Sequence, residues 1–136
     1  MCAVAVAAIV AGASRADVGV YSVTPEAARP GTPMTVRVGG FYGEFRAPLY
    51  VVPASRMPQW TVCGPKRVCA PSVGVAPTRW PYTRVGTITT ANKGVIRFRL
   101  PRVPAGRYGF AVYCDACTRG AGGTLIPSTR WLRVLR

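Results

Sequence analysis

Apolar and polar residues alternate along most of the chain after the first 16 residues. In the segment 34–38, MTVRV, the first, third and fifth residues are apolar and the two between them are Thr and Arg. Successive side chains of a strand point to opposite faces of a sheet, so this alternation predicts half-buried strands. Turn residues, mainly Gly, Pro and Asn, separate the alternating segments. The expected strands are residues 17–23, 34–38, 47–52, 83–90, 95–100, 107–114 and 130–135.

This pattern predicts an all-β fold: an antiparallel β-sandwich of about seven strands, in which each strand has one apolar face and one face carrying Arg. A hairpin turn is expected at 91–94, where Asn92 and Gly94 can adopt positive φ. The first strand is expected to direct Val18, Val20 and Ser22 to one face. With 136 residues the chain is long enough for one domain with its own core, which we place at 17–136.

The first 16 residues have a different character. Residues 1–13, MCAVAVAAIVAGA, form an apolar run of the length of a secretion signal, and they are too short for a bilayer span of roughly 20 residues. Ser14 and Ala16 make a small-residue cleavage site. No Lys or Arg lies between Met1 and the apolar run, so we expect a truncated signal peptide over 1–16, with a retained anchor or a buried apolar segment as alternatives. The expected location is extracytoplasmic, and no transmembrane helix is expected beyond the leader.

Four cysteines follow the leader, and an even number in an exported chain predicts two disulfides. Three pairings are open, of which local pairing, Cys63 with Cys69 and Cys114 with Cys117, is the simplest. The alternative is a thiol–disulfide protein using the C-x-x-C at 114–117, or a zinc site using all four thiolates. That C-x-x-C ends a strand instead of opening a helix, and the Cys63–Cys69 spacing is loose for zinc. We therefore favour structural disulfides and expect no cofactor or metal.

Residues 53–82, here called the Pro-rich segment, interrupt the strand pattern. They hold six prolines and are expected to form an irregular loop, with a short hairpin that turns at Gly64-Pro65. Exposed aromatic rings stack on sugars, and the planar fork of Arg recognises carboxylates and phosphates. A competing interpretation is that Trp60 and Trp80 cover the open edge of the core. The candidate ligand-binding residues are Trp60, Trp80, Tyr82, Arg56, Arg67 and Arg79.

The net charge is +14, from 18 basic and 4 acidic residues. Such a charge favours an anionic partner, here an envelope polymer or glycan, with another envelope protein as a further option. A genome rich in Arg codons would produce the same composition without any partner. Nucleic acid is disfavoured, because the Arg residues are spread over nearly every segment and the leader directs the chain out of the cytoplasm.

The chain has no histidine, which removes Ser–His and Cys–His pairs and the most common general base near neutral pH. Glu44 and Asp115 are the only two carboxylates worth considering for glycoside hydrolysis, and they fall in different loops. We therefore expect no enzyme. The expected function is an exported, non-catalytic binding or structural module that engages an anionic cell-envelope polymer or glycan through the Pro-rich segment. A cysteine-based redox or zinc protein is the alternative, and a carboxylate hydrolase ranks third.

Two stretches of sequence are similar to a known family. YSVTPEAARPGTPMTVRVGGF resembles the opening of bacterial secreted immunoglobulin-like domains of the early-set type, and RFRLPRVPAGRYGFAVYC resembles their late strand pair. The resemblance covers about 40 of the 136 residues. It implies an immunoglobulin-like sandwich in which the hydroxyl of Tyr108 bonds nearby backbone. It implies no ligand. Copper-binding periplasmic sandwiches of similar size would need His ligands, which this chain lacks.

Overall fold

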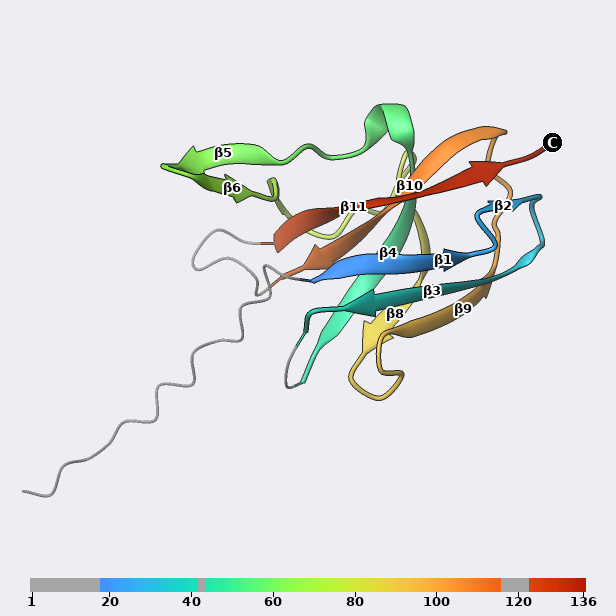
Figure 1. The fold of residues 1–136 in the computed structure, drawn as a ribbon, viewed down its shortest axis with the longest axis horizontal. Coiled ribbons are helices and arrows are strands. Elements are labelled where there is room, and N and C mark those ends of the chain that lie inside the picture. Colours follow the sequence, from blue (N-terminus) through green and yellow to red (C-terminus); the bar gives the residue numbers. More distant parts are fainter. Residues whose placement is uncertain (1–17, 42–43, 116–122) are drawn as a thin grey trace, which may run out of the picture.

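The computed structural model describes residues 18–41, 44–115 and 123–136, and over these residues the chain is all-β (Figure 1). The expected leader, residues 1–16, lies outside the described residues. The one helical element described is a 3-10 turn, η2 (Ala54–Arg56). This part of the chain contains no helix with the length and hydrophobicity needed to cross a bilayer. The strands are β1 (Gly19–Thr24), β2 (Ala27–Ala28), β3 (Pro33–Gly39), β4 (Arg46–Pro53), β5 (Thr61–Gly64), β6 (Arg67–Cys69), β7 (Ser72–Gly74), β8 (Thr83–Thr89), β9 (Val95–Arg99), β10 (Gly106–Cys114) and β11 (Gly123–Val134).

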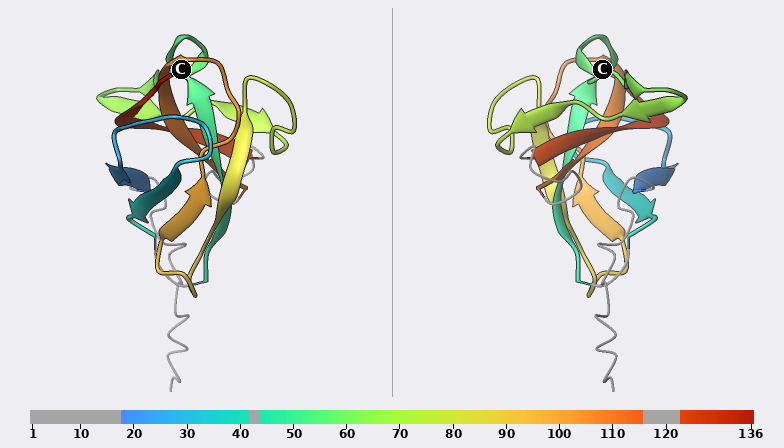
Figure 2. Two further views of the ribbon diagram at one scale, coloured as in Figure 1. Left: turned by 90° about the vertical axis from the view of Figure 1, so that its right-hand side faces the viewer. Right: turned by 90° about the vertical axis from the view of Figure 1, so that its left-hand side faces the viewer.

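The strands form two main sheets and one separate hairpin. The first sheet has three strands in the order β1-β3-β9. The second has six: β2-β11-β10-β4-β8, with β7 added along β11. All pairs are antiparallel except β2 with β11, which is parallel. The remaining strands, β5 and β6, pair with each other in a hairpin that extends from one end of the molecule (Figures 1 and 2).

The main hydrophobic core is shared by the two sheets. Val36 and Ile96 from the three-stranded sheet belong to the same buried cluster as Leu49, Phe110 and Leu132 from the six-stranded sheet. The alternation seen in the sequence explains this arrangement, because every second residue of β3 and β9 is turned away from solvent. Each such side chain removed from water stabilises the fold by about 1.5–3 kcal/mol.

Each of the seven expected strands is present, but two details differ. A register shift after Val20 turns Val23, and not Ser22, into the core, because a bulge reverses the alternation of the residues that follow. The last strand is also longer than expected, since β11 begins at Gly123 instead of residue 130. Its Pro127 lies opposite Ala111, next to a second register shift, where a strand tolerates proline.

Over β4 and most of β10, the outer face of the six-stranded sheet is not the solvated, Arg-bearing face that we expected, although exposed arginines remain at the start of β10 and in β11. Strands β4 and β10 are buried on both faces over most of their length. A second hydrophobic cluster, here called the outer cluster, covers this face. It consists of Tyr50, Val52, Met57, Ala111, Tyr113 and Leu125, with Ala76, Tyr82 and Trp131 packed against it. Met57, Ala76 and Tyr82 come from the Pro-rich segment, so this segment closes the second face of the sheet.

The hydroxyl of Tyr108 donates a hydrogen bond of 2.6 Å to the carbonyl oxygen of Pro104. This is the backbone contact implied by the resemblance for that tyrosine. Burial raises the pKa of the Tyr108 phenol above its ordinary value of 10.0. The bond ties the turn before β10 to the strand itself.

Candidate functional site

The Pro-rich segment is more ordered than the irregular loop that we expected. It contains η2 and the strands β5, β6 and β7, so the prolines separate short strands instead of preventing them. The expected hairpin is present, but its turn is at Pro65-Lys66, because Gly64 still pairs with Arg67. Lys66 adopts a positive φ of 54° in this turn.

A disulfide joins Cys63 to Cys69 across the hairpin, with their Cα atoms 5.9 Å apart. This confirms local pairing for the first two cysteines. Because both sulfurs are in a disulfide, neither is a thiolate that could bind zinc. Cys114, at the end of β10, is also disulfide-bonded. Cys117 lies outside the described residues. In the part of the chain that the structure describes, no three His, Cys, Asp or Glu residues gather into a group that could hold a metal ion.

The hairpin exposes apolar side chains. Val62 and Val68 lie directly opposite each other in the ladder, and they are 82% and 65% exposed. Residues directly opposite in an antiparallel pair share one face, so the two valines form a single apolar surface. Lys66 and Arg67 are exposed beside it. The hairpin therefore presents an apolar surface next to two positive charges.

Both candidate tryptophans are also exposed, Trp60 by 43% and Trp80 by 56%. The interpretation that they cover the open edge of the core is therefore wrong. The covering role belongs to Met57, Tyr82 and Trp131, which pack in or against the outer cluster. Met57 and Tyr82 reach the sheet because η2 and the turn before β8 lie over β10 and β4, whereas Trp131 belongs to β11 itself.

Three tyrosines anchor the Pro-rich segment to the sheet. The hydroxyl of Tyr50 donates to the carbonyl oxygen of Pro77 at 2.9 Å, and that of Tyr113 to the carbonyl oxygen of Gly74 at 3.1 Å. Tyr82 packs edge-on against Tyr50 with ring centroids 6.0 Å apart. Burial raises the pKa of both Tyr50 and Tyr82, although nearby Arg84 lowers that of Tyr50 to a smaller degree. Tyr82 is thus an anchor of the segment more than an open ligand-binding ring.

The six candidate ligand residues do not converge on one pocket. Trp60 and Arg67 line a hollow of about 440 Å³ between the hairpin and the start of β11. Tyr82 lines a smaller hollow of about 280 Å³ with Tyr50 and Arg84. The other three, Arg56, Arg79 and Trp80, are exposed on the surface of the segment. The candidates therefore form an extended surface, which suits a long ligand better than a small one.

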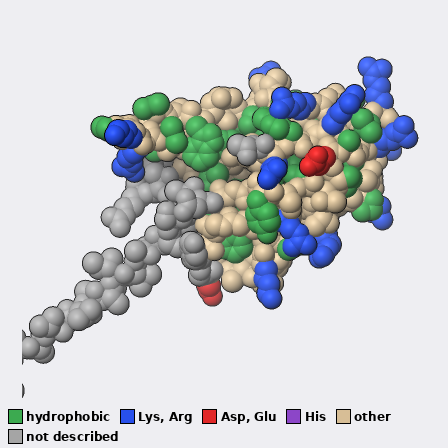
Figure 3. Space-filling model, in the orientation of Figure 1, with side chains coloured by type: hydrophobic (Ala, Val, Ile, Leu, Met, Phe, Trp, Pro, Cys, Tyr) green, Lys and Arg blue, Asp and Glu red, His purple; other side chains and the backbone are tan. Residues whose placement is uncertain are grey.

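No acidic residue occurs anywhere between Phe45 and Cys114. The Pro-rich segment falls inside this range, so its basic side chains face no carboxylate of their own segment. Figure 3 shows hydrophobic and basic side chains side by side at the hairpin end of the molecule, and further basic side chains at the end near the C terminus. A surface of this kind attracts anions at long range and offers apolar contact on arrival.

Glu44 and Asp115, which the sequence places in different loops, line one hollow of about 460 Å³ together with Thr89 and Thr90. The sequence did not reveal this proximity, because it arises where the start of β4 and the ends of β8 and β10 lie together at one end of the sheet. Two neighbouring carboxylates are a requirement of glycoside hydrolysis but do not by themselves define an active site.

Sequence reasoning also missed Arg107, Trp131 and Arg133, which meet on the outer face of the six-stranded sheet. No local signal marks them, because their meeting depends on the register of β10 against β11.

No family model, no curated protein and no solved structure matches this chain.

Proposed function

We propose that this chain is an exported, non-catalytic binding module with an immunoglobulin-like β-sandwich fold, and that it holds an anionic polymer of the cell envelope through its Pro-rich segment. The main support for this proposal is that exposed apolar side chains are concentrated in one region of the molecule. Of the large hydrophobic side chains exposed among the described residues, all except Tyr21 lie between Trp60 and Trp80. Soluble proteins seldom concentrate exposed apolar residues in one region unless that region binds something.

Two observations support the fold and the location. The sheets share one core and are almost wholly antiparallel, and Tyr108 bonds the backbone upstream of its strand as in immunoglobulin-like sandwiches. The disulfide between Cys63 and Cys69 is a bond that persists in oxidising compartments. It closes a hairpin at the surface, where reducing agents of a cytoplasm would reach it.

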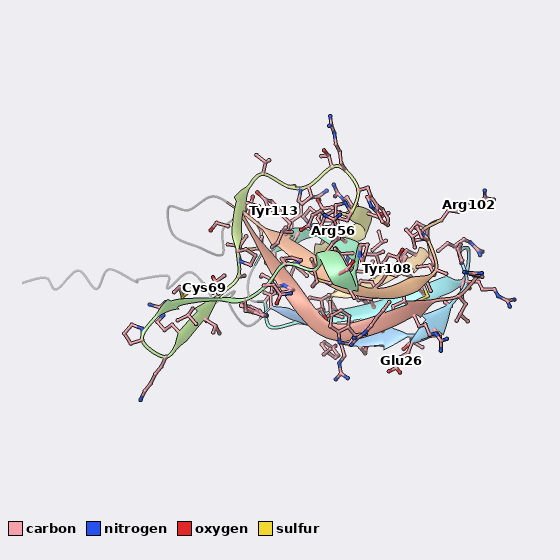
Figure 4. The ribbon with its side chains drawn as sticks, turned by 90° about the horizontal axis from the view of Figure 1, so that it is seen from above. Glu26, Arg56, Cys69, Arg102, Tyr108 and Tyr113 are labelled. Atoms are coloured by element: carbon pink, nitrogen blue, oxygen red, sulfur yellow. A yellow bond between two sulfur atoms is a disulfide. The ribbon has the colours of Figure 1, made fainter. Side chains whose placement is uncertain are left out.

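The chemistry of the segment suits an acidic polysaccharide or a similar polymer. Trp60 and Trp80 offer flat apolar faces to sugar rings, and Arg56, Arg67 and Arg79 offer planar forks to carboxylate or phosphate groups. Figure 4 shows Arg56 on η2 and Cys69 on the hairpin arm well apart along the molecule, so a ligand that contacts both regions must be long. A polymer satisfies this requirement.

Retention on a column of immobilised polygalacturonate tests the proposal. The triple variant Arg56→Gln, Arg67→Gln, Arg79→Gln should elute at a lower salt concentration than the native chain. A matched control, Arg97→Gln, Arg99→Gln, Arg102→Gln, loses the same charge from other exposed positions. It should elute close to the native chain if the segment is the binding surface, because only contacting charges determine the salt dependence.

Equal losses of retention in the two triple variants would show that net charge alone drives binding and would refute the proposal. The pair Trp60→Ala, Trp80→Ala separates stacking from charge. These substitutions should weaken retention at high salt, where electrostatic attraction is screened and the apolar contacts persist. Retention unaffected at every salt concentration would remove the tryptophans from the site.

A further inference from the structure

Two arginines lie directly opposite each other in the ladder between β10 and β11. Arg107 pairs with Arg133, and two residues further along the same ladder Gly109 pairs with Trp131. Positions two apart share a face, so both arginines and Trp131 lie on the outer face of the six-stranded sheet. Like charges directly opposite in an antiparallel pair disfavour folding. A bound anion between the two guanidinium groups would offset this repulsion.

Arg107 is held in a defined orientation. Its guanidinium carbon lies 4.1 Å from the centroid of the Trp131 ring, a cation–π contact. Trp131 reaches this position because Gly109 has no side chain: a Cβ there would lie 3.0 Å from the ring. A guanidinium already stacked on a ring loses less rotamer freedom when it binds a ligand. Arg107 is thus preorganised, with its edge free for hydrogen bonds.

Both arginines line a hollow of about 760 Å³ that also contains Trp131, Arg136 and Glu26. Glu26 is the one carboxylate residue in this lining, against three arginines. Its backbone carbonyl accepts the Arg133 N–H at 2.9 Å, which fixes β2 beside β11. In Figure 4 Glu26 projects from the edge of the molecule, and Figure 3 shows basic side chains gathered at this end. Positive charge therefore dominates the hollow.

We propose that Arg107 and Arg133 form a second binding site, separate from the Pro-rich segment, for an oxyanion group of a ligand, a phosphate or a carboxylate. Two guanidinium forks on neighbouring strands supply several parallel N–H donors, which is the arrangement that planar or tetrahedral oxyanions accept. Trp131 orients the first fork and does not itself contact the ligand. The anion also neutralises the repulsion between the two arginines.

Trp131 makes the site observable. In a chain carrying Trp60→Phe and Trp80→Phe, Trp131 is the remaining tryptophan. Its fluorescence should change saturably when inorganic phosphate or trigalacturonate is added, because an anion bound to the stacked guanidinium changes the electric field at the indole ring. The two probes separate a phosphate ligand from a carboxylate ligand. A saturable response to either probe supports the site. If neither phosphate nor trigalacturonate gives a saturable response, the proposal is overturned.

Arg133→Gln in the same background should weaken binding at least about tenfold, since hydrogen bonds to charged groups contribute that much. Arg133→Lys keeps the charge but loses the planar fork of Arg. Its affinity for the anion should lie between those of the parent chain and Arg133→Gln. The control Arg97→Gln, on the three-stranded sheet, should bind like the parent chain. The melting temperature of Arg133→Gln should not fall, because a like-charge contact is removed. Binding unchanged in Arg133→Gln, or weakened equally in Arg97→Gln, overturns the assignment.

Discussion

Replacing both Cys63 and Cys69 with serine removes the disulfide that closes the β5–β6 hairpin. The two cysteines are six residues apart, and the loop-entropy relation assigns about 2 kcal/mol to closing a loop of that size. Where this free energy is lost depends on how the hairpin is attached. Neither β5 nor β6 contains a buried residue, so the hairpin contributes little to either hydrophobic cluster. We therefore expect the loss to be local.

A local loss and a global loss give different results. If the hairpin unfolded together with the core, about 2 kcal/mol would lower the melting temperature of a domain of this size by roughly 8 °C. If it opens alone, the melting temperature should change by less than about 2 °C. Opening of the hairpin should then expose Lys66 and Arg67 to trypsin about 30-fold more often, the factor that corresponds to 2 kcal/mol.

The assay is calorimetric melting beside timed trypsin digestion of the native and double-serine chains. Cleavage after Arg102, in another exposed turn, serves as the internal control and should not accelerate. Retention on polygalacturonate should weaken in the double-serine chain, because an open hairpin no longer holds Trp60 and Arg67 in one hollow. A drop of the full 8 °C or so without faster hairpin cleavage would refute the reasoning and make the disulfide a staple of the core.

Three further predictions concern the fold. Gly94→Ala should reduce the free energy of unfolding in urea by about 2–4 kcal/mol, because Gly94 has a φ of 73° and a Cβ there would meet the carbonyl oxygen of Val38. Gly31→Ala, with a φ of 88° but open space around it, should lose only about 1–2 kcal/mol, and equal losses would show that the contact with Val38 is unimportant. Tyr108→Phe should lose about 1 kcal/mol in the same assay, since the bond to the Pro104 carbonyl is removed, whereas a neutral change would mean that water replaces it without loss. Finally, burial raises the pKa of Tyr50, Tyr82 and Tyr108 above the unfolded value near 10. As pH rises, the unfolded chain therefore releases these protons before the folded chain does. The free energy of unfolding should be unaffected by these groups below about pH 10 and should decrease as pH rises further. Phenolate absorbance in native and urea-unfolded protein checks this, and identical titration curves would contradict it.

The strands that bury one face were predictable from the sequence. In β3 and β9 the alternation of apolar residues with Thr or Arg predicts which face is buried, because successive side chains of a strand point to opposite faces of the sheet. Two local preferences misled the prediction, one for proline and one for asparagine. Pro127 lies inside β11 because a register shift lets a strand accept it, and Lys93, not Asn92, takes the positive φ in the 91–94 turn. The Asn92 side chain accepts backbone N–H bonds there instead.

The candidate site was also predictable only in part. Composition alone marked the Pro-rich segment as basic and aromatic, and its basic side chains and both tryptophans are exposed as a binding surface requires. It did not reveal which aromatic rings anchor the segment: Tyr82 lies against the sheet while Trp60 and Trp80 face solvent. That choice depends on which side chains meet the outer face of β4 and β10, and this face is defined only once the segment has folded back over it.

By itself, the sequence determined that this chain is all-β, where most of its strands run, and that its charge is overwhelmingly positive. Those properties depend on neighbouring residues and on sums over the chain. Only the tertiary structure decided that Arg107 opposes Arg133, that Trp131 stacks on one of them, and that Glu44 approaches Asp115. The first two depend on the register between the consecutive strands β10 and β11, and the third on strand ends that meet at one end of the sheet. Register depends on the burial pattern of both paired strands and on the turn between them, and a shift such as the one between Gly109 and Ala111 changes which residues are opposite each other.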